Sequence, residues 1–238
     1  LLANDYSQWE VRVLQMYAKD KNLGKAIVEG IDFHAKYGKI IFDVTETDEN
    51  FKNYRFLAKN GFVFPTIYGA SAKSICKTFW DKYLSKRFRN FNEGADFIAS
   101  VQQEFFNEFS GVKEWQQQLI ETYSKCGYVK TLFGRYRRSP IGYNELINTP
   151  IQSVASDFTL LSAIRIYKEL NLVPVLIIHD DLTYSVPEDE WYDYYIEIKK
   201  RMTQWDFEFV NVPIDIESKV GYNWCDMYEV DKLEKENK

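Results

Sequence analysis

The stretch 175–186 reads VLIIHDDLTYSV and contains two runs of β-forming residues on either side of a His-Asp-Asp triplet at 179–181. Branched and aromatic residues dominate both runs, and short runs of this kind around a polar segment are typical of a β-hairpin. We therefore predict a tight hairpin over about 175–186, with the acidic residues Asp180 and Asp181 at its turn.

Two further segments have the character of strands that could join this hairpin. Residues 1–5 form a short apolar run that ends at Asp5, and residues 213–220 alternate apolar and polar side chains. Alternation of this kind indicates a half-buried strand. One small sheet made of these strands would place Asp5 beside Asp180.

The rest of the chain is predicted to be mostly helical. A helix should follow the first strand, because Ser7, with Glu10 three residues later, matches a capping box. Residues 128–133, after the helix stop Gly127 and before Gly134, have the pattern of a short hairpin or extended segment. Hydrophobic periodicity predicts further helices at about 32–42, 50–69, 71–88, 92–108, 112–126, 150–170 and 191–205. A small sheet with this many helices is an α+β fold.

The composition excludes several classes of protein. The 238 residues carry a net charge of -5, and the three cysteines are too scattered for a zinc site or a disulfide framework. The longest aliphatic-rich run, 172–178, is much shorter than the roughly 20 residues of a membrane span, and no signal peptide is visible. These features predict a cytoplasmic protein without a membrane partner. The basic stretch 125–138, which contains no acid, could still form a track for phosphates.

Asp5 and Asp180 suggest metal-dependent phosphoryl transfer. Two divalent cations can activate an attacking hydroxyl and neutralise a leaving pyrophosphate, and Mg²⁺ needs only one or two carboxylates besides substrate phosphates. Arg55 and Lys59, four residues apart, share one face of the 50–69 helix, where both could hold a triphosphate. Each feature alone is more often a turn residue or a surface charge, but the combination indicates a nucleotidyl-transfer site.

Five segments, in order, resemble the sequence motifs of family A DNA polymerases, the DNA polymerase I type. They are residues 5–14 (DYSQWEVRVL, motif A), Arg55 and Lys59 followed by Tyr68-Gly69 (motif B), 127–135 (GYVKTLFGR), 148–152 (NTPIQ) and 179–181 (HDD, motif C). The resemblance covers nearly the whole chain. It implies template-directed DNA synthesis in a bacterium or a phage-infected cell, with primer–template DNA and deoxynucleotides as partners.

The resemblance also implies a right-hand polymerase fold, in which a small antiparallel palm sheet carries a large helical fingers insertion. Residues 1–16 and 131–238 would be palm, and residues 17–130 would be fingers, with the motif B helix at about 50–69. No segment resembles a thumb, a proofreading exonuclease or a 5′ nuclease. We therefore expect the chain to be a piece of something longer that works with an upstream thumb/exonuclease segment or a separate subunit.

The same resemblance implies roles for individual residues. Asp5, Asp180 and the backbone carbonyl of Tyr6 would hold two Mg²⁺ ions, for which Mn²⁺ could substitute, and Asp181 would be a further ligand with a shorter side chain than the family's usual glutamate. Lys59 would protonate the leaving pyrophosphate, and Glu10 would be a steric gate against the ribose 2′-hydroxyl. The residues expected to contact the nucleotide are Gln8, Glu10, His34, Arg55, Lys59, Phe64 and Tyr68; those expected to contact primer or template are Arg135, Asn148, Gln152 and His179.

Motif B departs from the family pattern by one residue. Phe64 follows Lys59 by five residues instead of four, and an extra helical residue rotates the next part of the helix by about 100°. A one-residue π-bulge would absorb this rotation and return Phe64 and Tyr68 to the face of Lys59. Pro65 adds strain because it cannot donate a backbone hydrogen bond. We therefore predict a bulge or kink within 60–65.

Other interpretations remain open. The chain could be the C-terminal fragment of a split polymerase, inactive until it joins its partner, or a decayed relative that only binds. A two-metal nuclease would share the carboxylates but would not need the cationic helix, and a single-subunit RNA polymerase would not be expected to keep Glu10 as a gate. Intact Asp5, Asp180, Arg55 and Lys59 argue against decay but not against a split polymerase.

Overall fold

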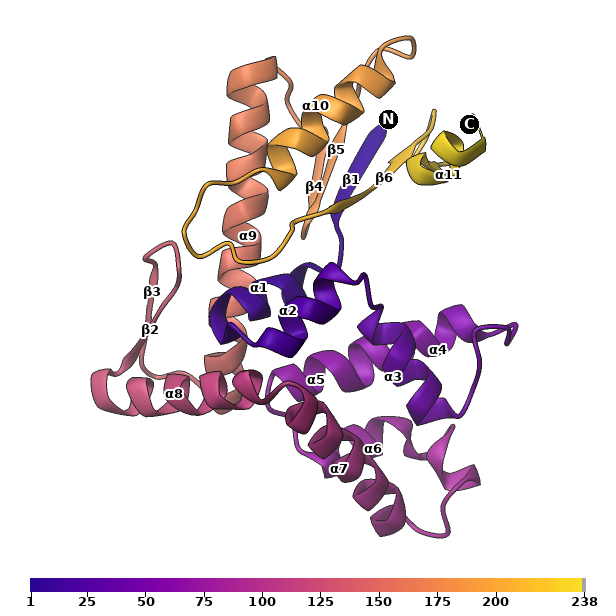
Figure 1. Cartoon of the computed structure of the whole chain (residues 1–238), viewed down its shortest axis with the longest axis vertical. Coiled ribbons are helices and arrows are strands. Elements are labelled where there is room, and N and C mark those ends of the chain that lie inside the picture. Colours follow the sequence, from indigo (N-terminus) through magenta and orange to yellow (C-terminus); the bar gives the residue numbers. More distant parts are fainter. Residues whose placement is uncertain (237–238) are drawn as a thin grey trace. The chain divides into compact units, whose positions relative to one another are not determined.

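The computed structural model describes residues 1–236, which divide into two compact units (Figure 1). The first unit comprises 1–17, 130–135 and the described residues from Pro150 onward, and the second comprises 18–129 and 136–149.

The first unit is built on a five-stranded antiparallel sheet with the strand order β4-β5-β1-β6-β7. The strands are β1 (Leu2–Tyr6), β4 (Leu176–Ile178), β5 (Asp181–Tyr184), β6 (Ile216–Val220) and β7 (Tyr228–Glu229), and the accompanying helices are α1 (Trp9–Ala18), α9 (Tyr143–Leu170), α10 (Trp191–Thr203) and α11 (Val230–Glu236). The predicted sheet is confirmed, because β1 lies between the hairpin β4–β5 and β6 (Figure 1).

Strand β1 lies in the middle of the sheet, and one complete face of it is buried. Leu2, Asn4 and Tyr6 are at most 2% exposed. The amide of Asn4 is satisfied inside the sheet, since its Nδ2 donates to the carbonyl of Leu182 at 3.2 Å and its Oδ1 accepts from Ser218 at 2.8 Å. A buried polar group with these partners costs little and disfavours a shift in register.

Aromatic packing ties the end of β1 to the surrounding helices. The rings of Tyr6 and Trp9 stack at 4.3 Å between centroids, and the indole of Trp9 donates to the carbonyl of Ala155 in α9 at 3.2 Å. The hydroxyl of Tyr6 bonds with Ser162 of α9 at 2.7 Å and donates to the carbonyl of Met202 in α10 at 2.9 Å. The backbone next to Asp5 is therefore held rigidly from both helices.

The second unit is helical. It contains α2 (Lys21–Val28), α3 (Phe33–Phe42), α4 (Phe51–Ala58), a π-helix (Lys59–Val63), α5 (Phe64–Ile67), α6 (Ala72–Trp80), a 3₁₀ turn (Leu84–Lys86), α7 (Phe91–Glu108) and α8 (Ser110–Cys126), followed by the hairpin of β2 (Tyr128–Lys130) and β3 (Tyr136–Arg138). Polar side chains cap several of these helices, including Asp20 for α2, Asp32 for α3 and Ser71 for α6.

Helices α3 and α4 approach each other closely at Gly38. A Cβ atom at this position would lie 3.4 Å from the carbonyl oxygen of Tyr54 and 3.5 Å from the Cα of Arg55. The absence of a side chain at Gly38 therefore lets α3 pack directly against the backbone that carries Arg55.

The predicted bulge in the motif B helix is confirmed as a π-helix over Lys59–Val63. The amide of Phe64 donates to the carbonyl of Lys59, five residues back, which is the bond that defines a π-turn. The helix then continues as α5, which ends at Ile67, and Gly69 just beyond it has a φ of 80° that suits a residue without a side chain.

Gly61→Ala should destabilise the protein by roughly 1–3 kcal/mol, because it overpacks this π-helix. A Cβ at Gly61 would lie 2.3 Å from the ring of Phe79 in α6, and that ring is only 1% exposed. Urea unfolding followed by circular dichroism measures the change. Gly142→Ala is the matched control, since its Cβ would approach nothing closer than 3.8 Å; equal stability of the two variants would contradict the prediction.

Some predicted boundaries were wrong. The helix expected to begin at 150 begins at Tyr143 and passes through Pro150, and the helix expected over 71–88 ends at Trp80 before a short 3₁₀ turn. The capping box was also wrong, because α1 begins at Trp9 and the hydroxyl of Ser7 donates to Glu217 instead. Helices α2 and α11 were not predicted. Within the described residues, no helix is both long enough and apolar enough to cross a membrane.

Candidate functional site

Acidic side chains face one another across the middle of the sheet. Asp5 in β1 lies directly opposite Asp181 in β5 and Glu217 in β6, so the three carboxylates share one face. Asp5 and Glu217 are exposed, and Asp181 is half-buried. Like charges that face each other destabilise a sheet, so a bound cation would relieve the repulsion here.

Asp180 lies in the turn next to this row of acids. Because Ile178 pairs with Asp181, only His179 and Asp180 remain in the loop between β4 and β5. Asp181, which was expected at the turn, lies in β5 instead. His179 has a φ of 55°, a conformation that costs a residue other than glycine about 1–2 kcal/mol. Such strain is concentrated at functional sites, and it is located here beside the two aspartates that the sequence singles out.

The carboxyl of Asp181 differs from that of Asp5. Its Oδ1 accepts a hydrogen bond from the hydroxyl of Thr183 at 2.7 Å. Burial raises the pKa of Asp181, and the neighbouring charge of Asp180 raises it further, while Thr183 and Lys219 act in the opposite direction. Asp181 therefore ionises less readily than an ordinary aspartate, and one of its oxygens is already occupied by Thr183.

The donor set fits Mg²⁺ better than a softer metal. Asp5 and Asp180 offer carboxylate oxygens, which are the ligands that Mg²⁺ prefers. Among residues 1–236, no group of three or more His, Cys, Asp and Glu side chains could hold a metal by itself. Two carboxylates suit a cation that completes its coordination with ligand oxygens and water, as Mg²⁺ commonly does.

The turn from β1 into α1 holds Gln8 in a second strained conformation. Gln8 has a φ of 46°. The buried guanidinium of Arg12 braces this turn, because its Nε donates to the carbonyl of Ser7 at 2.7 Å and its Nη1 donates to the carbonyl of Pro213. The side chain of Gln8, which is expected to contact a triphosphate, thus extends from a backbone turn that the hydrogen bonds of Arg12 hold in place.

Two predicted site residues that lie far apart in the sequence meet in the first unit. Glu10 is in the first turn of α1, and its Oε1 accepts a hydrogen bond from Nε2 of Gln152 in α9. The bond limits the rotamers available to the Glu10 carboxylate. A fixed carboxylate is what a steric gate requires.

Arg135, predicted to contact DNA, already has an acidic partner. Its Nη2 lies 3.0 Å from Oδ1 of Asp157 in α9. Burial raises the pKa of Asp157, and the charge of Arg135 opposes that shift. The ion pair therefore leaves a partly exposed guanidinium in a defined orientation.

In the second unit, Arg55 is paired with Asp32, the residue that caps α3. The Nε of Arg55 donates to Oδ2 of Asp32 at 2.6 Å, while Oδ1 of Asp32 accepts from the amide of Ala35 at 2.9 Å. Although burial alone would raise the pKa of Asp32, the Ala35 amide and Arg55 together hold it below its usual value. One carboxylate thus joins the start of α3 to the cationic helix.

His34, in the first turn of α3, is buried among cations. The side chain is 2% exposed, and its Nδ1 has no hydrogen-bond partner. Burial and the neighbouring charges of Lys59 and Arg55 together lower the pKa of His34 to about 4, while Asp32 opposes them. The imidazole is therefore neutral at pH 7, and its Nδ1 is a buried polar atom without a hydrogen-bond partner.

Lys59, Phe64 and Tyr68 share one face of the bulged helix. The ammonium of Lys59 lies 5.4 Å from the ring centroid of Phe64, and the rings of Phe64 and Tyr68 are 6.2 Å apart. The ring of His34 meets Phe64 edge-on at 5.5 Å. The π-helix therefore has the predicted effect of bringing both aromatic rings back to the side of Lys59.

A groove of about 580 Å³ adjoins this face within the second unit. Phe64, Tyr68 and Asn148 line it, together with Asn60 and Arg137. Arg137 donates to Thr149 at 2.7 Å and to Glu145 at 2.9 Å. Stacking rings and amide groups in one groove are suited to a flat polar ligand such as a nucleobase.

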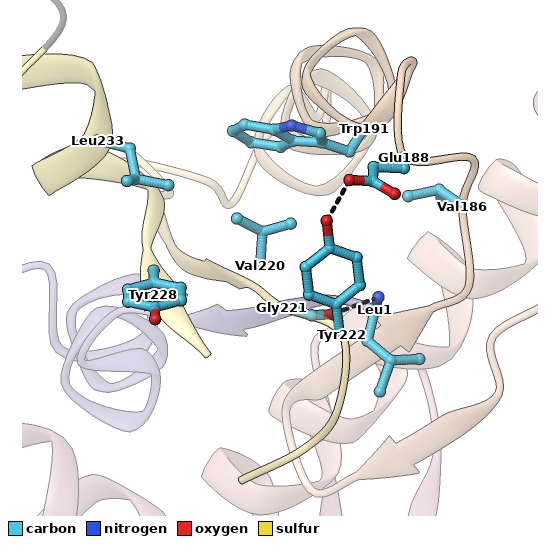
Figure 2. Close-up of a pocket in the computed structure, with 9 residues that line it drawn as sticks. All are labelled: Leu1, Val186, Glu188, Trp191, Val220, Gly221, Tyr222, Tyr228 and Leu233. Carbon is cyan, nitrogen blue, oxygen red and sulfur yellow. Dashed lines mark hydrogen bonds between the residues drawn. The ribbon is translucent and has the colours of Figure 1, made fainter. Parts of the chain in front are cut away.

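A second hollow, of about 290 Å³, lies in the first unit away from the acids (Figure 2). Leu1, Trp191 and Tyr222 are among the residues that line it, and Tyr222 donates a hydrogen bond to Glu188 (Figure 2). Leu1 precedes β1, whereas Asp5 lies near the other end of that strand. This hollow is therefore separate from the carboxylates of Asp5, Asp181 and Glu217 in the middle of the sheet.

His34 should make the protein acid-sensitive. Its pKa is about 4 in the folded state against 6.5 as the ordinary value, so the unfolded chain binds the extra proton between these pH values. The free energy of unfolding should therefore fall by about 3 kcal/mol as the pH drops from 7 to 4. Urea unfolding of the wild type and of His34→Gln at several pH values isolates the contribution of His34 to the free energy of unfolding. The same pH dependence in both proteins would contradict the prediction.

Several residues at these clusters were not predicted. Asp32 and Asp157 orient the predicted site residues Arg55 and Arg135, and Arg137 and Glu145 line the groove of the second unit. Asp32 could have been found, because an Asp directly before the apolar start of a helix is a cap signal. The other contacts join residues distant in the sequence and leave no local pattern.

Comparison with known proteins agrees with this geometry. Residues 1–226 match the family model for DNA polymerase family A. The chain is 31% identical over 241 residues to DNA polymerase I of Chloroflexus aurantiacus and 30% identical over 242 residues to that of Streptococcus pneumoniae, covering 95% and 94% of this chain. It spans only 24% and 26% of those two relatives.

A solved structure has the same fold. The POL domain of Pol1 from M. smegmatis, in complex with a DNA primer-template and dNTP, superimposes with a TM-score of 0.71 at 23% identity, covering 94% of this chain and 39% of that one. The likeness confirms the predicted α+β fold. With the family model matched over residues 1–226, the chain belongs to DNA polymerase family A.

Proposed function

We propose that this chain carries the catalytic residues of a template-directed DNA polymerase, which adds deoxynucleotides to a primer 3′ end. The observation that carries the proposal is the position of Asp180 in the hairpin turn beside Asp5, on a chain that belongs to family A. The relative from M. smegmatis that binds primer-template and dNTP supports the choice of substrates.

The first unit would act as the palm and the second as the fingers. Residues 136–149, which we expected in the palm, group with the second unit, so the proposed boundaries are those of the two compact units.

Asp5, Asp180 and the backbone carbonyl of Tyr6 would hold two Mg²⁺ ions, with Mn²⁺ as a substitute and Asp181 as a weaker additional ligand. Bound metal would supply an activated primer hydroxyl and charge neutralisation at the leaving pyrophosphate. The chain's own contribution is to fix the carboxylates, through the register of β1 and β5 and through the Tyr6 hydrogen bonds.

The cationic cluster would bind the triphosphate. Arg55 keeps its terminal amino groups for phosphate because Asp32 takes its Nε, and neutral His34 can donate or accept one hydrogen bond. Lys59 would protonate the leaving pyrophosphate, and Gln8 would add a contact from its strained turn. Phe64 and Tyr68 would pack against the sugar and base.

Recognition of sugar and duplex would come from the remaining predicted residues. Glu10, held by Gln152, would crowd a ribose 2′-hydroxyl. Arg135, oriented by Asp157, and His179 in the strained turn would contact primer or template, as would Gln152 and Asn148.

A second candidate is a fragment that is active only with its partner. The chain spans about a quarter of the DNA polymerase I relatives described above, so the activity of the whole relative need not reside in this part. The same catalytic residues would then work only after assembly with a thumb-bearing segment or subunit.

Extension of a labelled primer–template tests the proposal. We expect Mg²⁺-dependent incorporation of deoxynucleotides, with Glu10→Ala raising ribonucleotide incorporation roughly tenfold or more, since removal of a clash worth 1.4 kcal/mol gives a factor of ten. Extension with unchanged sugar selectivity in Glu10→Ala would remove the gate role. Complete absence of extension, alone and with a thumb-bearing partner, would overturn the polymerase assignment.

A further inference from the structure

Ser7, at the exit of β1, has a partner for each of its three polar groups. Its amide donates to the carbonyl of Asp215 at 3.0 Å, and its carbonyl accepts from Nε of Arg12 at 2.7 Å. Its hydroxyl donates to Oε1 of Glu217 in β6 at 3.0 Å. These three hydrogen bonds make Ser7 a fixed point between β1 and α1.

The fixed point matters because of the residue that follows it. Gln8 has a φ of 46°, in the left-handed region that residues other than glycine rarely adopt. Such a conformation persists only where the surrounding structure over-determines it. On the helix side, the carbonyl of Gln8 accepts from the amides of Val11 and Arg12 at 3.1 and 3.2 Å. On the strand side, the bonds of Ser7 supply the restraint.

Glu217 is the partner of Ser7 whose contribution can be separated from folding. Asp215 contributes only a backbone carbonyl, and the side chain of Arg12 is buried at 8% exposure, whereas Glu217 is exposed. Burial lowers the pKa of Arg12, and the charges of Asp215 and Glu217 oppose that shift. Replacing Glu217 therefore releases one restraint on the turn without opening a cavity in the core.

The surroundings of Glu217 suit a hydrogen-bond acceptor better than a metal ligand. Glu217 pairs with Asp5 from the β6 side, whereas Asp181 and the turn that carries Asp180 lie on the β5 side. Within the described part of the chain, no group of three or more His, Cys, Asp and Glu side chains could hold a metal. One oxygen of Glu217 is also already engaged by Ser7.

We propose that Glu217 is a positioning residue of the polymerase reaction, which holds Ser7 and through it keeps Gln8 and the Tyr6 carbonyl in the conformation needed for nucleotide binding. The inference rests on the proposed function. If only molecules with a correctly formed turn bind the nucleotide, loosening the turn lowers the apparent affinity by the fraction that remains competent. The step affected is nucleotide binding, and the affinity for DNA is unchanged.

Primer extension at saturating primer–template tests this role. Glu217→Ala should raise the KM for the deoxynucleotide about threefold to tenfold, the factor that corresponds to the net free energy of one hydrogen bond. Ser7→Ala removes the other end of the same bond and should have the same effect. In the double variant the two effects should not add, because either substitution alone removes the bond.

Glu217→Gln separates the hydrogen bond from the charge. The amide oxygen of glutamine still accepts a hydrogen bond but carries no charge, so Glu217→Gln should bring the KM back to within about twofold of the wild type. A metal ligand would behave differently. In that case Glu217→Gln would be as impaired as Glu217→Ala, and both would need more Mg²⁺ for half-maximal rate while Ser7→Ala would not.

The controls separate positioning from folding. Glu190→Ala removes an exposed acid that directly precedes α10 and should keep the wild-type KM. The melting temperatures of all these variants should equal that of the wild type. Hydrogen exchange gives a readout that needs no catalysis, since the amide of Ser7 should exchange faster in Glu217→Ala than in the wild type or in Glu217→Gln.

Three outcomes would overturn the positioning role. They are an unchanged KM in Glu217→Ala, additive effects of Ser7→Ala and Glu217→Ala, and the metal-ligand pattern with no recovery in Glu217→Gln. The polymerase assignment fails separately. A wild type that extends no primer, alone or with a thumb-bearing partner, counts against that assignment, whereas extension by the wild type with an unchanged KM in Glu217→Ala counts only against Glu217.

Discussion

Asp180→Ala should slow primer extension by about a thousandfold or more with little loss of stability. Asp180 lies half-exposed in a two-residue turn, so the substitution removes a carboxylate without opening a cavity in the core. Loss of several kcal/mol of transition-state stabilisation costs about tenfold in rate for each 1.4 kcal/mol. Single-turnover extension of a labelled primer at saturating Mg²⁺ measures the effect.

Asp189→Ala is the matched control for this experiment. Asp189 is an exposed acid in the segment between β5 and α10 and has no place in the candidate site. It should extend primers at the wild-type rate, and both variants should melt at the wild-type temperature. Extension by Asp180→Ala within a few fold of the control would exclude Asp180 from catalysis.

Lys59→Ala should lower the rate of the chemical step by about a hundredfold to ten-thousandfold, the range typical of a lost general acid. Lys59→Arg distinguishes charge from proton transfer, because arginine keeps the positive charge but does not give up its proton. If Lys59 protonates the pyrophosphate, Lys59→Arg should restore nucleotide affinity without restoring the rate. Full rescue by arginine would reduce the role of Lys59 to electrostatic binding.

The same substitution has a second readout in His34. Lys59 lowers the pKa of His34, so the pKa should rise in Lys59→Ala and stay low in Lys59→Arg. The chain contains only two histidines, which makes the imidazole titration by NMR simple to assign. Lys52→Ala, at an exposed lysine on α4, should change neither the rate nor this pKa.

Features that arise from local patterns were predictable. The hairpin around 179–181 and the alternation in 213–220 follow from side-chain periodicity, and their pairing with residues 1–5 is the simplest way to bury three apolar strands. The bulge in the motif B helix was also predictable, because the extra residue before Phe64 forces a rotation that only a π-turn or a kink can absorb.

Features that depend on distant partners were not predictable in this way. A proline usually marks the first turn of a helix, yet α9 runs through Pro150, since the completely buried Ile147, Ile151 and Val154 stabilise the helix on both sides. Ser7 has the pattern of a helix cap, but its hydroxyl donates a hydrogen bond to Glu217, 210 residues away in the sequence. In both cases tertiary packing outweighs a local preference worth only a few kcal/mol.

The sequence by itself determined the family, the α+β fold, the strand-end aspartates and the need for a bulge, because motif spacing and periodicity are properties of neighbouring residues. Only the tertiary structure decided how the functional side chains are held, through the pairs Asp32–Arg55, Asp157–Arg135 and Gln152–Glu10. It alone decided which apolar side chains stay exposed, since exposure depends on what the rest of the fold leaves uncovered. These properties arise from contacts between residues far apart in the chain, which no local pattern records.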